Sequence, residues 1–518
     1  MTTDTSTPVT IAGNDRIIQV LDALVRRGSQ GWGVRELSTA LDASRTTVHR
    51  ALLGLADSEL AAADPAGNYS IGPRARVHAA LLHRRHPLLV HAPSILETLS
   101  RTADATALVG VLGPDDDQAF VAAIREREGP MRYQFHAGAP LPLHAGAVGR
   151  AILSVTGVGV LPEELPQYTE RTVTDHAVLR REIEEITVRG FALSEGQHIP
   201  LATGIAVPVR MPDGLVAAVS ASRPRSEVQE AMIPDLVECV RAAARDLHEA
   251  VAASSPHPAA GVEPHPARSA VERLEKLVEL LVRSPTRIPS GAALGRVLRV
   301  SSITSSRLQS SAEVAGLVLP RPDGGLTSGP LLLRWAATLG ARFDVAVLAH
   351  EHLVALASTT GETVGMALYD AHTESATMAA VIEGRKRIGY TIAEGSEVPL
   401  HAGAAGKAIL AFCDAAVVER VSLAPLTANT TTDVRRLRAD LADITRAGSA
   451  VAGGERIPEA LGIAAPIFAD GVVRGSVTIT IPRARADSGS VEQLLDEVRR
   501  TARRVSTLIS VGPELPVG

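Results

Sequence analysis

The chain has 518 residues, roughly three to five times the length of a typical single domain, so several domains are expected. Hydrophobic residues make up 45% and charged residues 21%, a balance that excludes a wholly disordered or collagen-like protein. The formal net charge of -5 excludes a general attraction of the whole molecule to DNA or to an anionic membrane, so any contact with nucleic acid must be local.

Apolar runs and cysteines bear on location and on metal binding. Residues 1–10 carry neither a basic cluster nor an apolar stretch, and no window approaches the roughly 18 apolar residues of a membrane helix. We therefore expect a cytoplasmic protein. Cys239 and Cys413 lie far apart, with no CxxC and no neighbouring His pair, which predicts buried free thiols, no metal site and no cofactor.

The chain repeats itself. The segment PLHAGAVGRAIL at 142–153 recurs as PLHAGAAGKAIL at 399–410, displaced by 257 residues, with ten of twelve positions identical. The same displacement relates Arg50 to Arg307, and after one inserted residue Gly204 corresponds to Gly462. We predict one ancestral unit written twice, with domains at 13–75, 76–251, 269–331 and 332–513 and a Pro/Ala/Ser/His-rich linker at 252–268.

Residues 13–75 are predicted to form a winged helix-turn-helix domain. Apolar residues recur at helical spacing over 17–25, Gly31-Trp32-Gly33 breaks the chain, and a short helix follows over 34–41. Ser44 is a good N-cap for a third helix, whose apolar residues fall at 48, 52 and 55. Residues 60–63 and 69–71, on either side of a turn, predict the two-stranded wing.

The third helix is the expected DNA-reading element, because the second helix of such a pair fits the major groove. Arg45 and Arg50 are candidates to contact guanine or phosphate, and the other polar residues to contact backbone or a thymine methyl. A small helical bundle with a solvated Arg face is the alternative. Residues 13–75 contain seven Arg and seven acidic residues, so the domain as a whole is not basic. The candidate DNA-contacting residues are Ser44, Arg45, Thr46, Thr47, His49 and Arg50.

Residues 76–251 predict an α+β domain with an antiparallel sheet covered on its faces. Helices are expected at 77–82, 93–99, 144–153, 178–189 and 228–251, and strands at 105–112, 118–124, 131–135 and in a hairpin over 191–222. The Ala/Gly-rich entry to the helix at 144–153 could present backbone N–H groups to a small carboxylate. Close packing of small residues against the sheet is the alternative.

The second half has the same order, with a divergent helix-turn-helix at 269–331. Several apolar positions of the reading helix become Ser, Gln or Ala, which leaves Leu308, Val314 and Leu317 to hold it. Residues 269–331 contain eight Lys and Arg and five acidic residues, so we predict that this head relies more on phosphate contacts than the first head does. Its candidate DNA-contacting residues are Ser302, Thr304 and Arg307.

These motifs resemble the IclR family of bacterial transcriptional regulators over nearly the full length of the chain, twice. The resemblance is carried by SRTTVHR at 44–50, YSIG at 69–72, the PLHAGA segments, RTVTD at 171–175 and GIAVPV at 204–209. It implies a repressor or activator whose GAF-like C-terminal domain binds a small organic acid or aromatic metabolite, and whose partner is double-stranded operator DNA. It also implies a homodimer of the tandem chain with four reading heads, and an operator with unequal half-sites.

The resemblance also assigns effector-binding positions. In the first half these are Ala147, Val148, Ser194, Gly204, Ser220 and Ser222, and in the second half they are Ala404, Ala405, Ala452, Gly462, Thr478 and Thr480. The usual acidic or Cys positions of the pocket are Ser or Gly here, and Ala or Gly in the second copy, so the identity of the ligand stays open. Neighbouring side chains that could set specificity are Met131, Arg132, Gln197, His198, Arg385, Glu455 and Arg456.

An enzyme and a sensor without DNA binding are the two alternative classes of function. An enzyme is not expected, because the chain has no GxSxG elbow, no HExxH and no complete P-loop. Lys407 is replaced by Arg150 in the other copy, which suits a surface cation or one near an anion better than a catalytic amine. A small-molecule sensor that acts through protein partners, without specific DNA binding, is the alternative function. His144 and His401 could bind a carboxylate, although a packed helix-entry His is the commoner outcome.

Overall fold

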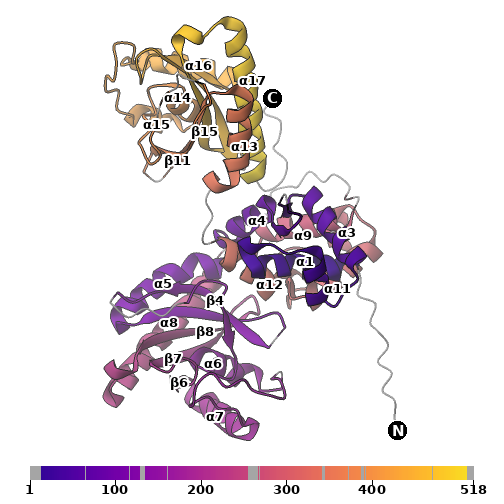
Figure 1. The fold of residues 1–518 in the computed structure, drawn as a ribbon. Helices are drawn as coiled ribbons and strands as arrows, with labels where there is room; N and C mark the ends of the chain where they lie inside the picture. The colour runs from indigo at the N-terminus through magenta and orange to yellow at the C-terminus, as the bar shows by residue number, and fades with distance from the viewer. Residues whose placement is uncertain are drawn as a thin grey trace. The chain divides into compact units, whose positions relative to one another are not determined.

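A computed structural model describes residues 13–64, 66–115, 117–128, 135–159, 161–254, 267, 269–340, 345–371, 373–386, 390, 392–469 and 471–509 (Figure 1). The chain divides into two compact units, residues 1–343 and 344–518. The first unit holds the segment 13–75, the sheet domain that follows it and the three helices and strand pair of the segment 269–331, and the second unit holds the other sheet domain. No helix in the described ranges is both long and apolar enough to cross a membrane.

The first head, residues 13–75, has the predicted elements. They are α1 (Gly13–Arg27), α2 (Val34–Ala40), α3 (Arg45–Asp57) and the antiparallel pair β1 (Ala61–Ala63) and β2 (Tyr69–Ile71). The Ser44 hydroxyl accepts a hydrogen bond from the Thr47 N–H at 3.1 Å, the N-cap that the sequence predicts. Val48, Leu52 and Leu55 are fully buried, so α3 turns its opposite face to solvent.

The second head, residues 269–331, has α9 (Ala270–Arg283), α10 (Gly291–Leu298), α11 (Ser302–Val314) and the pair β9 (Val318–Pro320) and β10 (Leu326–Ser328). Leu308 and Leu317 are buried as predicted, but the expectation for Val314 is wrong, because its side chain is 81% exposed at the last residue of α11. Ser305 is fully buried instead, since its hydroxyl donates to the Gly291 carbonyl at 2.9 Å. A satisfied hydroxyl thus replaces an apolar contact in this core.

The two heads pack against each other within the first unit. Helix α1 contacts α9 and α11, and α4 (Pro73–His83) contacts α9, α12 (Pro330–Trp335) and the π-turn η4 (Ala336–Gly340). Asp22 on α1 accepts hydrogen bonds from the Arg334 guanidinium at 2.7 Å and from the Trp335 indole at 2.8 Å. The segment 332–340, which we expected to open the second effector-binding domain, therefore packs with the heads.

A six-stranded antiparallel sheet forms the domain between the heads, in the order β5-β4-β3-β8-β7-β6. Helices α5 and α8 pack together on it, and α6 covers β7 and β8 with α7 packed behind (Figure 1). The element bounds are β3 (Thr106–Leu112), β4 (Gln118–Arg125), β5 (Pro140–Pro142), β6 (Ala192–Glu195), β7 (Ala202–Arg210), β8 (Val216–Pro224), α5 (Pro87–Ala103), α6 (Ala147–Thr156), α7 (His176–Arg189) and α8 (Ile233–Ala253).

This domain confirms the predicted class of fold, an α+β arrangement with an antiparallel sheet. Helix α5 begins six residues before the predicted start, because Pro87 occupies its first turn and the internal Pro93 does not end it. The predicted hairpin over 191–222 is three strands. The strand expected at 131–135 lies outside the described residues except for Phe135, which is not in a strand.

The second unit repeats the design with a five-stranded antiparallel sheet, β12-β11-β15-β14-β13. Helices α13 and α17 pack together on it, and α14 covers β14 and β15 with α16 behind. The bounds are β11 (Thr363–Asp370), β12 (Ser375–Ile382), β13 (Ala450–Gly453), β14 (Ala460–Ala469), β15 (Val472–Pro482), α13 (Val345–Thr360), α14 (Ala404–Leu410), α15 (Ala415–Arg420), α16 (Val434–Ala447) and α17 (Ser488–Ile509). The two cysteines are free thiols, but each is half-buried rather than buried.

Candidate functional site

The first reading helix presents its predicted polar residues to solvent. Arg45, Thr46, His49 and Arg50 are exposed, and none of them takes part in an ion pair or side-chain hydrogen bond among the described residues. Thr47 is half-buried, because its hydroxyl and N–H both meet the exposed cap Ser44. The face opposite the buried leucines therefore carries two free guanidinium groups next to a capped helix N-terminus, a combination that suits contact with the phosphates and bases of DNA.

Helix α11, the predicted second reading helix, repeats the cap but not the charge. Ser301 accepts from the Thr304 N–H at 3.2 Å, as Ser44 does from Thr47. Ser302 and Arg307 are exposed, while Thr304 is half-buried against its cap. Arg307 occupies the place of Arg50, but Ser302 stands where the first head has an arginine. The reading face of α11 therefore carries one guanidinium where that of α3 carries two.

The first of two cavities lies between α6 and the sheet. The open space within its lining is about 490 Å³, a figure that includes space open to solvent. Pairing of β6, β7 and β8 sets Ser194, Gly204 and Ser222 in one row, and Ser220 shares the face of Ser222. A side chain at Gly204 would meet Ser222 and Ala147, so glycine keeps this space open. The six predicted positions that line the cavity are Ala147, Val148, Ser194, Gly204, Ser220 and Ser222.

Four further residues near the first cavity were predicted as side chains that could set its specificity. His198 lines it and packs edge-on against Tyr168, with ring centroids 5.2 Å apart. Burial, together with the charge of His144, lowers the pKa of His198, so its imidazole is neutral at pH 7. Gln197 lies behind the lining, where its side-chain oxygen accepts from the Ser194 hydroxyl at 2.6 Å. Met131 and Arg132 lie outside the described residues.

The second cavity encloses about 500 Å³ and has the same construction. Gly462 pairs with Ala452 and with Thr480, and Thr478 shares the face of Thr480. The six predicted positions that line it are Ala404, Ala405, Ala452, Gly462, Thr478 and Thr480. Glu455 and Arg456 also line it, in the places of Gln197 and His198, whereas Arg385 is exposed and not among the lining residues.

The charged groups around the two cavities differ. In the second cavity the Glu455 carboxylate accepts from the Gly403 N–H at 2.9 Å and pairs with the Lys407 ammonium at 2.7 Å. In the first cavity, no acceptor for the Gly146 N–H is found among the described residues. Arg150 replaces Lys407 there and pairs with Glu182 of α7 at 2.9 Å. In the second cavity the Glu455 carboxylate is thus bound to the Gly403 N–H, whereas in the first cavity the corresponding Gly146 N–H is available.

Two sequence hypotheses about this region are decided by hydrogen bonds. His144 and His401 are both buried, and their Nε2 atoms pair with the Pro166 carbonyl at 2.8 Å and the Ala424 carbonyl at 2.9 Å. Their role is therefore structural. Lys407 is not a surface cation but a buried one, placed near two carboxylates. Sequence reasoning missed the Glu455–Lys407 pair, for which the only signal was the exchange of Gln197 for an acid in the repeat.

Comparison with known proteins places this architecture. The bacterial transcriptional regulator IclR C-terminal domain matches twice, at residues 80–249 and 338–507, and the IclR helix-turn-helix domain matches at 15–65. The transcriptional regulator BhcR of Paracoccus denitrificans is 30% identical over 240 residues, covering 45% of this chain and 85% of BhcR. The transcriptional repressor AllR of Escherichia coli is 27% identical over 245 residues, covering 46% of this chain and 89% of AllR.

An IclR transcriptional regulator from Alicyclobacillus acidocaldarius is 24% identical, with a TM-score of 0.42, and the match covers 47% of this chain and 99% of that one. The relatives are transcriptional regulators and not enzymes. Because the domain matches span most of the sequence, this chain belongs to the IclR family of ligand-responsive, DNA-binding transcriptional regulators.

Proposed function

We propose that this single chain carries two DNA-reading heads and two effector sites, the equipment that related proteins assemble from two identical chains. The observation that carries the proposal is the repetition of whole sites. Helices α3 and α11 share a hydroxyl cap and an exposed Arg, and two cavities of matching size are ringed by corresponding residues. In this proposal the domains are 13–75, 76–251, 269–331 and 332–513, joined by the linker 252–268.

The two heads differ in what they read. Arg45 and Arg50 on α3 suit bidentate contacts with guanine, whereas the face of α11 has Arg307 beside the exposed, apolar Ile303. Arg296 and Arg299 are exposed at the end of α10 and suit phosphate contacts. We infer an operator with unequal half-sites, of which the first head reads the more specific one. The remaining DNA contacts fall to Ser44, Thr46, Thr47, His49, Ser302 and Thr304.

Binding to the DNA upstream of the protein's own gene tests this function. Fluorescence anisotropy at two salt concentrations separates sequence reading from phosphate contacts, because each lost phosphate contact reduces the salt slope by about 1. Arg45→Ala with Arg50→Ala is expected to abolish specific retention, since each bidentate pair contributes about 1–3 kcal/mol. Arg307→Ala is expected to weaken binding to all sequences alike.

The outcomes that contradict the proposal are distinct. Wild-type binding that is indifferent to sequence at both salt concentrations would favour a sensor that acts through protein partners. Full loss of affinity after scrambling only the half-site of the second head would refute the unequal roles of the heads. Circular dichroism of the double Arg variant provides the control for folding, because both side chains are exposed.

The effector of the first cavity is proposed to be a small organic or aromatic acid. Its available Gly146 N–H, its neutral His198 and its Ser220 and Ser222 hydroxyls can all donate to a carboxylate. The second cavity already holds the Glu455 carboxylate at the matching amide, so a second anion there would meet like charge. The matched variants Ser222→Ala and Thr480→Val each remove one hydroxyl and keep the shape of the cavity.

Calorimetric titration with a panel of organic and aromatic acids tests the assignment of cavities. Ser222→Ala is expected to weaken binding of the acid that the wild type selects, and Thr480→Val to leave it unchanged. The reverse result would assign the acid to the second cavity. No binding by any acid, with folded protein, would refute the proposed effector class.

We also propose a homodimer of the tandem chain in the cytoplasm, with four reading heads in the assembly. Light scattering on a gel-filtration column measures the mass directly, against 54.2 kDa for one chain. A single species of twice this mass is expected, and a strict monomer at micromolar concentration would refute the dimer.

A further inference from the structure

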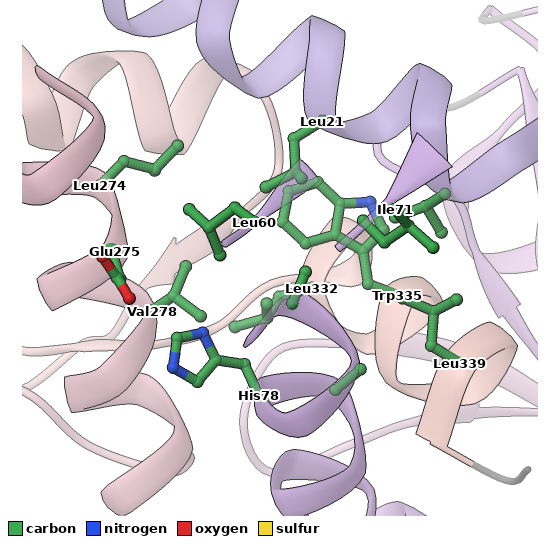
Figure 2. Close-up of a pocket in the computed structure, with 13 residues that line it drawn as sticks. Leu21, Leu60, Ile71, His78, Leu274, Glu275, Val278, Leu332, Trp335 and Leu339 are labelled. Carbon is green, nitrogen blue, oxygen red and sulfur yellow. The ribbon is translucent and has the colours of Figure 1, made fainter. Parts of the chain in front are cut away.

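The boundary between the two heads contains a cavity with one polar end. Most of its lining is apolar and comes from α1, α4, α9, α12 and the wing of the first head. Figure 2 shows His78 projecting from α4 toward the end of the cavity at which Glu275 of α9 lies. Glu279, one turn further along α9, completes a group whose nitrogen and oxygen atoms all lie within 4.8 Å of one another. We call His78, Glu275 and Glu279 the interhead cluster.

His78 has no hydrogen-bond partner among the residues that the structure describes. Its side chain is 3% exposed, and both ring nitrogens are buried without a donor or acceptor in the described parts of the chain. A neutral imidazole always has one nitrogen that donates and one that accepts, so leaving both unpaired is costly and unusual in folded proteins. A buried polar side chain of this kind indicates a group that the protein atoms alone do not supply.

The repeat shows what an ordinary packing role would look like at this place. The displacement of 257 residues maps His78 to Trp335 and Glu279 to Asp22. At the related place the Trp335 indole of α12 donates to Asp22 of α1 at 2.8 Å, so the ring is both packed and satisfied. At the place of His78 and Glu279 this closed pair is exchanged for an imidazole whose two nitrogens have no partner among the described residues. The exchange is unexplained by packing, because the tryptophan fills more of the apolar interface.

The charges of the interhead cluster are also unbalanced. Arg74 pairs with Glu275 at 3.2 Å and with Glu279 at 2.8 Å, so one guanidinium serves two poorly exposed carboxylates. The site therefore lacks one positive charge beside an available imidazole nitrogen.

We propose that His78, Glu275 and Glu279 bind a divalent transition-metal ion, Zn²⁺ by the chemistry of the donors, between the two heads. One imidazole and two carboxylates are a common protein donor set for a tetrahedral ion, with water in the fourth position. Donor atoms around such an ion are about 3.3 Å apart, so small rotations of the two Glu side chains close the site. Each carboxylate has two oxygens, so Arg74 can hold one while the metal takes the other.

The position of the site gives it a mechanical consequence. Helix α4 follows the wing of the first head, and α9 is the first helix of the second head. A metal ion bound by both helices would fix one arrangement of α3 relative to α11, and so one spacing of the DNA half-sites. The metal-binding measurement below uses no DNA, so its outcome is independent of the proposed function.

Metal binding to the full-length protein tests the proposal. The protein is stripped with a chelator, freed of it, and titrated with Zn²⁺ in competition with a chromophoric chelator, and with Co²⁺ followed by its visible absorption. We expect one tight equivalent per chain, Co²⁺ bands typical of tetrahedral coordination, and a rise in the melting temperature of the first unit on addition of Zn²⁺. His78→Leu and Glu275→Gln are each expected to weaken Zn²⁺ binding by at least about a hundredfold.

Controls separate the interhead cluster from surface binding. His350→Gln with His352→Gln removes a His-Glu-His run on α13 of the second unit and should leave the tight equivalent intact. Glu275→Gln keeps the shape of the side chain, so it tests metal binding by the interhead cluster even if His78→Leu does not fold. Absence of tight binding in the folded wild type, or binding that persists in Glu275→Gln and disappears in the α13 variant, would overturn the proposal.

Discussion

Lys407 holds together the polar side of the second effector cavity, and its removal has a calculable cost. Its side chain is 3% exposed, and its ammonium lies 2.7 Å from Glu455 and 2.8 Å from Asp440. Lys407→Met leaves Glu455, only 13% exposed, without its cation, while Asp440 is 34% exposed and can be hydrated. Breaking a buried ion pair from one side typically costs about 3–5 kcal/mol, and we expect the lower end here.

Calorimetric melting of the full-length protein measures this cost. A loss of about 3 kcal/mol corresponds to a fall of about 6–12 °C in the melting temperature of a domain of this size. Adding Glu455→Gln to Lys407→Met removes the uncompensated charge and keeps an oxygen that can accept from the Gly403 N–H, so the double variant should recover most of the loss.

Two results would refute this reasoning. One is a single variant that melts within about 1 °C of the wild type, and the other is a double variant no more stable than the single one. Arg150→Met is the matched control, because it removes the corresponding cation of the first unit, whose partner Glu182 is 33% exposed. It should leave the transition of the second unit unchanged.

Three further predictions concern the core, the pH response and the second reading helix. Gly149→Ala places a methyl group 2.1 Å from the Pro142 carbonyl oxygen, which is backbone, so urea denaturation should show a loss of about 3 kcal/mol. The lowered pKa of His198 keeps its imidazole neutral at pH 7, whereas a bound carboxylate favours the protonated form. Calorimetric titration should therefore show proton uptake on binding, and tighter binding of the acid as the pH falls from about 7.5 to about 5.5. Binding that does not depend on pH would contradict this prediction. Val314→Asp should change stability by no more than about 0.5 kcal/mol because the side chain is exposed, whereas Leu308→Ala should cost about 2–4 kcal/mol, a difference that thermal denaturation followed by circular dichroism measures.

Local signals in the sequence predicted most of the elements. The Ser44 cap, the apolar spacing of α3 and the wing turn all depend on residues a few positions apart, and the structure confirms each of them. The positions that the repeat and the family motifs indicated are found in the lining of both cavities. Alternate residues of a paired strand lie on the same face, so these positions point to one side of the sheet.

Contacts between distant residues were decided by tertiary structure alone. Val314 was expected to hold α11, yet its side chain is 81% exposed at the last residue, whereas Ser311 and Ala312 of the same turn are buried. Glu455 reaches Lys407 across 48 residues, and His78 meets Glu275 across nearly 200, through the packing of α4 on α9. Periodicity reports which face of a helix is apolar, but not which other face will cover it, so the cluster between the heads and the charge of the second cavity emerge only when the chain is folded.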